Sequence, residues 1–191
     1  MERAFFKLQS SVNSRHLNTL MTLFEQTIPL YKRMLANLDA ILVKAGAWAA
    51  EKKMSDETIL KARLVLDMFP LVKQVQVACD NAKNTAFRLS GKEVIKFEDE
   101  ETSLEELRGR IHKTLELLNE FTEADFADAT ERKIVMPYHD NKVMPGEVYV
   151  LEYALPNFFF HLTTAYDILR HYGLDIGKKD CLGPLSLQDP Q

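Results

Sequence analysis

Apolar residues between Pro70 and Gly91 alternate at steps of three and four along the chain. This spacing keeps the apolar side chains on one face of an α-helix, which turns about every 3.6 residues. Pro70 suits the start of such a helix, and Gly91 suits its end, where glycine readily takes the left-handed conformation. A helix with this long apolar face must pack against other helices, so the sequence predicts a helical protein. The apolar face consists of Val72, Val75, Cys79, Ala82, Ala86 and Leu89.

Three further segments show signals of long helices. Residues 30–50 carry apolar side chains at the same spacing and predict an amphipathic helix. Ser103 and Glu106 have the spacing of a capping box, so another helix is expected to begin there. Pro145 suits the first turn of a last helix. Pro156 is expected to kink or restart that helix, because proline has no N–H to donate.

Shorter elements connect these helices. Ser55 suits the N-cap of a short helix that is expected to run to Phe69. Residues 132–146, RKIVMPYHDNKVMPG, alternate around a polar tip, which is typical of a small hairpin or an ordered loop. Gly173 is expected to end the last helix in the left-handed conformation, with Leu174 folded back on it. Together these segments predict an all-α fold, an up-down four-helix bundle with a short extra helix.

Composition limits the kinds of partner. The chain has 191 residues, 46% of them hydrophobic and 27% charged, with a formal net charge of -4, as in a single globular domain. It has no basic stripe, and no apolar run approaches the roughly 18 to 20 residues of a membrane span. We therefore expect neither nucleic acid nor a membrane as partner. Cys79 and Cys181 match no zinc spacing, so both are expected to be reduced thiols of a cytoplasmic protein.

The first twenty residues differ from the rest of the chain. They are rich in serine, and basic residues outnumber acidic ones. Such a segment resembles a mitochondrial presequence, although an upstream start or a short extra helix before the domain accounts for the pattern more simply. We therefore expect a leader or extra helix at 1–20, a bundle domain at 21–183 and a C-terminal tail at 184–191.

Two long stretches resemble a known family. They are ARLVLDMFPLVKQVQVACDNAKNTAFRLSG at residues 62–91 and PNFFFHLTTAYDILRHYGLDIGKKDCLG at residues 156–183. Both are similar to the family called domain of unknown function nineteen-ninety-three, which in turn resembles the DinB/YfiT-like superfamily of four-helix bundles. The resemblance implies the same fold. It also implies a divalent metal, held by one histidine of the second helix and an HxxxH pair of the fourth, and thiol-dependent transferase or hydrolase chemistry.

Carrying this metal pattern over residue by residue leaves one of its three histidines. His161 takes the place of the second histidine of the HxxxH pair, and Asn157 replaces the first. The histidine of the second helix corresponds to Gln76, within two residues that also admit Gln74. Amide oxygens are weak substitutes for imidazoles at zinc or nickel. His161, Asn157 and Gln76 are therefore weak metal ligands, and we expect no cofactor.

Three functions remain open for the polar residues around His161. In the leading interpretation they line a pocket for a small molecule, with His161 as the candidate catalytic base because its ordinary pKa is about 6.5. Alternatively, they hydrogen-bond one another and fix helix packing in an interaction protein, for which we expect a homodimer. The third is a divalent-metal-dependent transferase or hydrolase. A cavity that reaches His161 favours the first. The residues are Gln76, Asp80, Asn157, His161 and Tyr166.

Overall fold

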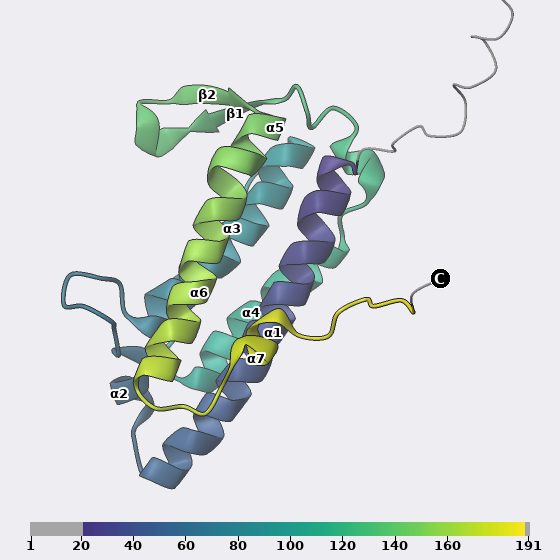
Figure 1. Ribbon diagram of the computed structural model, residues 1–191. Coiled ribbons are helices and arrows are strands. Elements are labelled where there is room, and N and C mark those ends of the chain that lie inside the picture. The colour runs from purple at the N-terminus through teal and green to yellow at the C-terminus, as the bar shows by residue number, and fades with distance from the viewer. Residues whose placement is uncertain (1–20, 190–191) are drawn as a thin grey trace, which may run out of the picture.

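The computed structural model describes residues 21–189, in which four long helices form a bundle (Figure 1). Helix α3 packs against α4 and α6, and α1 packs against the same two helices from the other side. The expected all-α bundle is therefore confirmed. The expected leader or extra helix at 1–20 lies outside the described residues. The four helices are α1 (Leu23–Lys52), α3 (Leu71–Ser90), α4 (Leu104–Asn119) and α6 (Leu155–His171).

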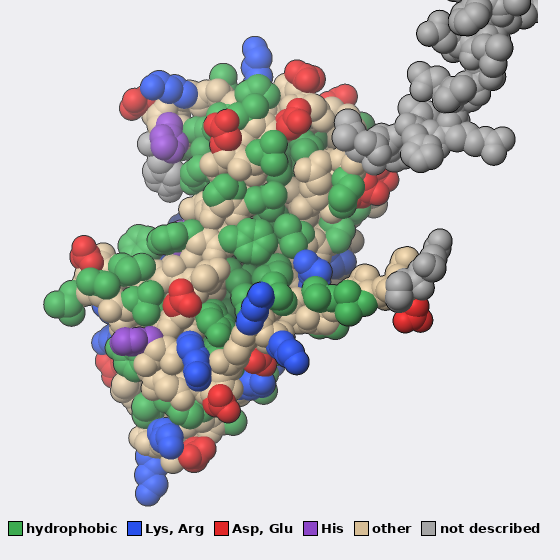
Figure 2. Space-filling model, viewed as in Figure 1, with side chains coloured by type: hydrophobic (Ala, Val, Ile, Leu, Met, Phe, Trp, Pro, Cys, Tyr) green, Lys and Arg blue, Asp and Glu red, His purple; other side chains and the backbone are tan. Residues whose placement is uncertain are grey.

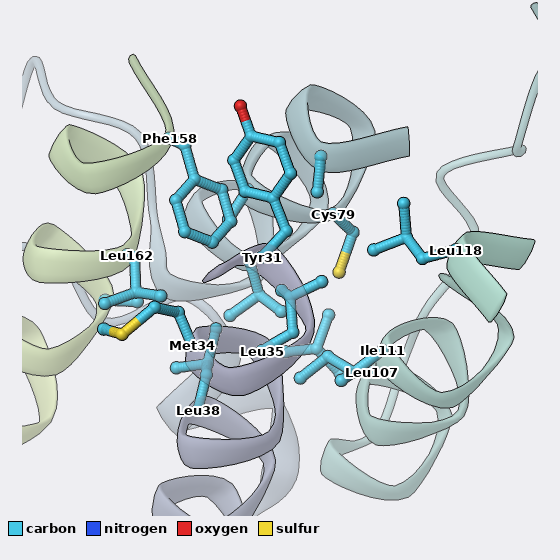
Figure 3. Packing of buried hydrophobic residues seen from close by; sticks show 14 of the residues in the cluster. Tyr31, Met34, Leu35, Leu38, Cys79, Leu107, Ile111, Leu118, Phe158 and Leu162 are labelled. Atoms are coloured by element: carbon cyan, nitrogen blue, oxygen red, sulfur yellow. The ribbon is translucent and has the colours of Figure 1, made fainter. Parts of the chain in front are cut away.

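The core forms where the apolar faces of the four helices meet (Figure 3). The rings of Tyr31 and Phe158 lie 4.7 Å apart, edge to face, and join α1 to α6. Val75 and Cys79 of the predicted α3 face are fully buried. Burying one large apolar side chain contributes about 1.5–3 kcal/mol to stability, so this shared interior holds the bundle together.

A side-chain cap begins α4 and a glycine ends α6 at the expected places. The Oγ of Ser103 accepts a hydrogen bond from the N–H of Glu106 at 3.1 Å. The Glu106 carboxylate reaches back to the N–H of Thr102 instead of that of Ser103, so only half of the predicted capping box forms. Gly173 has a φ of 103°, and the N–H of Leu174 donates to a carbonyl of the preceding turn, as predicted.

The predicted helix from Ser55 to Phe69 is wrong beyond its first turns. Helix α2 covers only Asp56–Leu60, and the following residues form a loop, which we call the 61–70 loop. The Arg63 guanidinium donates to two carbonyls of this loop, those of Leu66 and Met68, at 3.3 Å each. Side-chain hydrogen bonds of this kind satisfy backbone oxygens without a helix, and they stabilise the loop.

The predicted hairpin is confirmed. Strands β1 (Lys133–Met136) and β2 (Lys142–Pro145) pair antiparallel. Asp140 and Asn141 in the turn both have a φ of 56°, which these two residue types tolerate better than most. A 3₁₀ turn, η1 (Glu123–Phe126), precedes this hairpin, and a second one, η2 (Pro137–His139), lies between its two strands.

A π-helical turn precedes Pro156 in the last helix. Helix α5 (Gly146–Tyr149), the π-helix η3 (Val150–Ala154) and α6 follow one another directly. Pro156 lies in the first turn of α6, so the expected restart occurs there by way of the π-helix. A π-turn adds residues to one turn and thereby rotates the side chains before it relative to those after it. Tyr149 lies directly before this turn and Tyr153 lies within it.

A short helix, α7 (Lys178–Leu182), packs on α1 and is not indicated by the sequence pattern. The Asn37 side chain of α1 donates to the Cys181 carbonyl at 2.9 Å. Lys44 of α1 forms an ion pair with Asp180. None of the helices between residues 21 and 189 has both the length and the apolar composition needed to cross a membrane.

Candidate functional site

A groove of 360 Å³ runs between α3 and the last helix. The two helices are antiparallel: Arg88 contacts Tyr149 at one end, and Gln74 contacts His161 at the other. Figure 2 shows the surface hollowed between the hairpin and the 61–70 loop, on the left of the view. The α3 wall consists of Lys73, Val77, Asp80, Asn81, Asn84 and Arg88; Tyr149, Tyr153 and Asn157 form the other wall, and Phe69 lies at one end.

Side-chain amides form the middle of this groove. Asn81 is only 6% exposed, and its Oδ1 has no hydrogen-bond partner among residues 21–189. The Oδ1 of Asn84 is likewise buried and unpaired within this range. Asn157 contributes a third amide from the opposite wall. An unpaired buried acceptor costs about 1–3 kcal/mol, so two on one wall are an uncommon feature.

Tyrosine hydroxyls connect the Arg88 end of the groove to the core. The hydroxyls of Thr85 and Tyr149 lie 3.3 Å apart, and Tyr31 donates to Thr85 at 3.4 Å. The Arg88 Nη1 donates to the Tyr149 hydroxyl at 3.3 Å. Burial raises the pKa of Tyr31 above its usual range, so this phenol stays protonated. The network holds the Tyr149 ring in place, and this ring lines the groove next to Arg88.

The hairpin contacts the same end of the groove through His139. Its ring lies edge-on to the ring of Tyr153, with centroids 6.3 Å apart. The rings of Tyr149 and Tyr153 are stacked at 5.8 Å, with 26° between their planes. The turn of the hairpin therefore borders the groove, which the sequence pattern of the hairpin alone does not reveal.

His161 lies behind the groove and acts on it through Gln74. Its Nδ1 is 2.7 Å from the Gln74 Oε1, and the Gln74 Nε2 donates to the carbonyl of Phe69 at 3.0 Å. Because Oε1 can only accept, Nδ1 carries the proton in this arrangement. His161 is 7% exposed, and burial lowers its pKa below the ordinary 6.5. This chain of hydrogen bonds holds Phe69 of the 61–70 loop at the end of the groove.

The predicted cluster of five polar residues does not form one cluster. The Gln76 Nε2 donates to a Glu101 carboxylate at 2.7 Å, on the side of α3 that faces away from His161. Two residues correspond to about 200° of helical rotation, so Gln74 faces His161 where Gln76 cannot. Tyr166 is half-buried against the core. Asp80 and Asn157 do line the groove, and their role in binding stays a prediction.

Asp80 belongs in addition to a buried ion cluster centred on Arg110. The Arg110 side chain is 2% exposed and lies 3.1 Å from Asp80, 3.0 Å from Asp99 and 2.8 Å from Glu101. The buried Lys83 ammonium also pairs with Asp80, at 3.1 Å. Sequence reasoning missed this cluster, although the acidic run FEDEET at 97–102 was a signal. It clamps residues 92–103, the connection between α3 and α4, onto the bundle.

Comparison with known proteins identifies the family. The family model described as Domain of unknown function (DUF1993) matches residues 23–182. The chain belongs to the DUF1993 family. The DUF1993 protein is also similar to a solved structure, a DinB family member protein from Shewanella denitrificans. The two chains are 45% identical with a TM-score of 0.84, over 88% of this chain and 96% of that one. No curated protein matches.

The residues of this DUF1993 protein do not fit the metal site that the DinB resemblance implies. Among residues 21–189 no three histidine, cysteine or acidic side chains are grouped to hold a metal ion. At the corresponding positions His161 is the only imidazole, and Gln74 uses its Oε1 to accept from it. Asn157 offers one neutral amide. Zinc and similar ions require several imidazoles or charged ligands, which this set of donors lacks.

The two cysteines are poorly suited to nucleophilic chemistry. Cys79 is fully buried on the α3 face, and burial raises the pKa of its thiol to about 12. Burial also raises the pKa of the Cys181 thiol. A thiol reacts as its thiolate, so both cysteines are protonated and weakly reactive at neutral pH.

Proposed function

We propose that this DUF1993 protein binds a small polar molecule in the groove between α3 and the last helix. The observation that carries the proposal is the Asn81 side chain, which lines the groove, is 6% exposed and leaves its Oδ1 unpaired within residues 21–189. Such an acceptor costs stability. Proteins retain polar groups of this kind where function requires them, and a ligand N–H or O–H would satisfy this oxygen.

The surroundings of Asn81 support the same function. A volume of 360 Å³ falls within the range of about 300–1,000 Å³ of small-molecule pockets. The groove combines three amides with the rings of Tyr149 and Tyr153, and Tyr153 belongs to a π-helix, an element that is frequent at functional sites. A larger hollow of 660 Å³ lies at the start of α1, but none of the unpaired buried side-chain atoms between residues 21 and 189 lies in its lining.

Blocking the groove tests this function. Asn157→Trp places a large ring in the groove, whereas Leu151→Trp adds the same ring at a position that is 57% exposed on the same continuous helix and outside the groove. We expect a thermal-shift screen of amino acids, small carboxylic acids and nucleobases to find a compound that stabilises the parent. Free ligand at 100 times its Kd contributes about 2.7 kcal/mol. The compound should also stabilise Leu151→Trp and fail with Asn157→Trp.

Two results would contradict the proposal. The first is a stabilising compound that acts equally on Asn157→Trp and the parent, because its site must then lie elsewhere. The second is a screen in which no compound stabilises the parent. Asn84→Phe fills the groove from the α3 side and replaces Asn157→Trp if that variant fails to fold.

A further inference from the structure

We propose that the ligand of the groove is a small carboxylic acid that carries a hydrogen-bond donor, with its carboxylate on Arg88 and its donor on the α3 amides. This inference rests on the function proposed above and names the chemistry of the ligand. Arg88 is half-buried in the α3 wall at the Tyr149 end of the groove. Its guanidinium donates one hydrogen bond to the Tyr149 hydroxyl and has no ion pair with another described residue.

Other cations near the groove have acidic partners. Lys73, at the opposite end, forms an ion pair with Asp99. Lys83 pairs with Asp80, and Arg110 with three carboxylates. Arg88 is therefore the groove-lining cation whose charge is not balanced by a carboxylate within residues 21–189. A guanidinium presents five N–H donors in a fork that matches the two oxygens of a carboxylate, and one hydroxyl occupies only part of it.

The amides next to Arg88 determine the rest of the ligand. Arg88, Asn84 and Asn81 follow at steps of four and three, so they share one face of α3. The span from Arg88 to Asn81 is about 10 Å at 1.5 Å per residue. Both asparagines leave an oxygen unpaired within residues 21–189, and an oxygen of this kind only accepts. A matching ligand therefore presents N–H or O–H groups beyond its carboxylate, as amido, amino and hydroxy acids do.

The charge of the site favours a monoanion. Arg88 supplies one unbalanced positive charge, and the carboxylate of Asp80, next to Asn81 on the α3 wall, is already compensated by Lys83 and Arg110. A phosphate dianion would bring a second negative charge with no cation to meet it, and burying an unpaired charge is costly. We therefore assign the site to a carboxylate and not to a phosphate.

A pair of probes that differ only in charge tests this assignment. Glutaramate carries a carboxylate and a primary amide, and glutaramide has the same length and two neutral amides. We expect titration of the ¹⁵N-labelled protein with glutaramate to shift the NMR signals of the Arg88 side chain and the groove asparagines saturably. Glutaramide should bind roughly tenfold more weakly, as expected when one charge-assisted hydrogen bond is lost. Inorganic phosphate should not compete with glutaramate.

Arg88→Gln should remove this preference, so that glutaramate and glutaramide bind the variant with similar affinities. Arg33→Gln changes the net charge equally at an exposed position of α1 outside the groove, so it should keep the preference. Arg88→Lys retains the charge without the fork, and it replaces Arg88→Gln if that variant loses its dispersed spectrum. Here a partial loss of preference is expected.

The failure of this inference differs from the failure of the proposed function. Equal affinity for the two probes, with both lost in Asn157→Trp, would overturn the carboxylate assignment and leave a groove that binds small molecules. Competition by phosphate, or an unchanged preference in Arg88→Gln, would overturn it as well. If neither probe shifts the groove signals, this ligand class is wrong, while the wider compound screen still decides the proposed function.

Discussion

At the residue scale, His161 shows that a buried polar residue can support a site without lining it. Its ring donates to Gln74, and Gln74 donates to the Phe69 carbonyl. His161 does not line the groove, so the groove is not the cavity expected to reach His161, and the proposed small-molecule function rests on Asn81 instead. His161 can therefore act on the groove only through Gln74 and Phe69. We regard it as a positioning residue for the 61–70 loop.

Replacing His161 should cost stability in a way that glutamine restores. His161→Ala leaves the buried Gln74 oxygen without its donor, and we expect a loss of about 1–3 kcal/mol. The side-chain amide of His161→Gln can donate to the same oxygen and should recover much of this loss. Denaturant unfolding at pH 8, where the imidazole is neutral, measures both variants. An alanine variant as stable as the parent would show that the hydrogen bond to Gln74 contributes nothing.

The pH dependence of stability gives a second test of the role of His161, with His161→Gln as the control. Burial lowers the pKa of His161 in the folded protein below the ordinary 6.5, so the unfolded chain binds the proton more readily. The stability of the parent is therefore full above pH 6.5 and falls as the pH drops below it, until the lowered folded pKa is passed. His161→Gln has no such proton, so the parent should lose stability relative to it between pH 8 and pH 5.5.

At the element scale, the sequence predicts helices well and their orientation less well. The periods of α1, α3 and α4 and the caps at Ser103 and Gly173 are local signals, and they were confirmed. The 61–70 loop was missed because its residues favour a helix locally, while the Arg63 hydrogen bonds that hold it depend on the folded backbone. Of the groove residues, the sequence pointed to Asp80 and Asn157. It could not decide between Gln74 and Gln76, because an uncertainty of two residues spans opposite faces of a helix.

The connection between α3 and α4 depends on one buried cation. Arg110→Met removes the only guanidinium within residues 21–189 that pairs with Asp80, Asp99 and Glu101, and it leaves these acids close together. We expect a loss of about 3 kcal/mol, because breaking a buried ion pair leaves charges uncompensated. Hydrogen exchange of residues 92–103 should become faster, since Arg110 also donates to the Glu98 carbonyl.

Arg108→Met is the matched control for this element. Arg108 lies on the same helix and forms a partly exposed ion pair with Asp39 through two hydrogen bonds, at 2.8 Å and 3.2 Å. Both side chains keep some contact with solvent, so this variant should cost less stability than Arg110→Met and leave exchange in residues 92–103 unchanged. Equal effects of the two variants would show that the buried cluster does not clamp the connection.

At the scale of the whole molecule, this chain shares its bundle with a DinB family member protein. The polar side chains between its helices, however, do not make up a histidine-rich metal site within residues 21–189. The apolar faces that build the bundle tolerate many sequences, because burial is not directional. A metal site tolerates few, because the type and direction of each ligand matter. The TM-score of 0.84 therefore establishes the fold, and the amides of the groove must be interpreted from their own chemistry.

The arrangement of the four helices predicts which substitutions would create a metal site. In the double variant Gln74→His with Asn157→His, two new imidazoles join His161, since Gln74 contacts it and Asn157 lies one turn before it on α6. We expect its zinc affinity, measured by competition with a chromophoric chelator, to exceed that of the parent at least tenfold, because zinc prefers several imidazoles. The double variant Gln76→His with Asn157→His contains the same number of histidines, but Gln76 faces Glu101 across α3 from His161. It should therefore bind zinc no better than Asn157→His alone. If this control bound zinc as tightly as the first double variant, the helical phase that places Gln74 and not Gln76 beside His161 would be wrong.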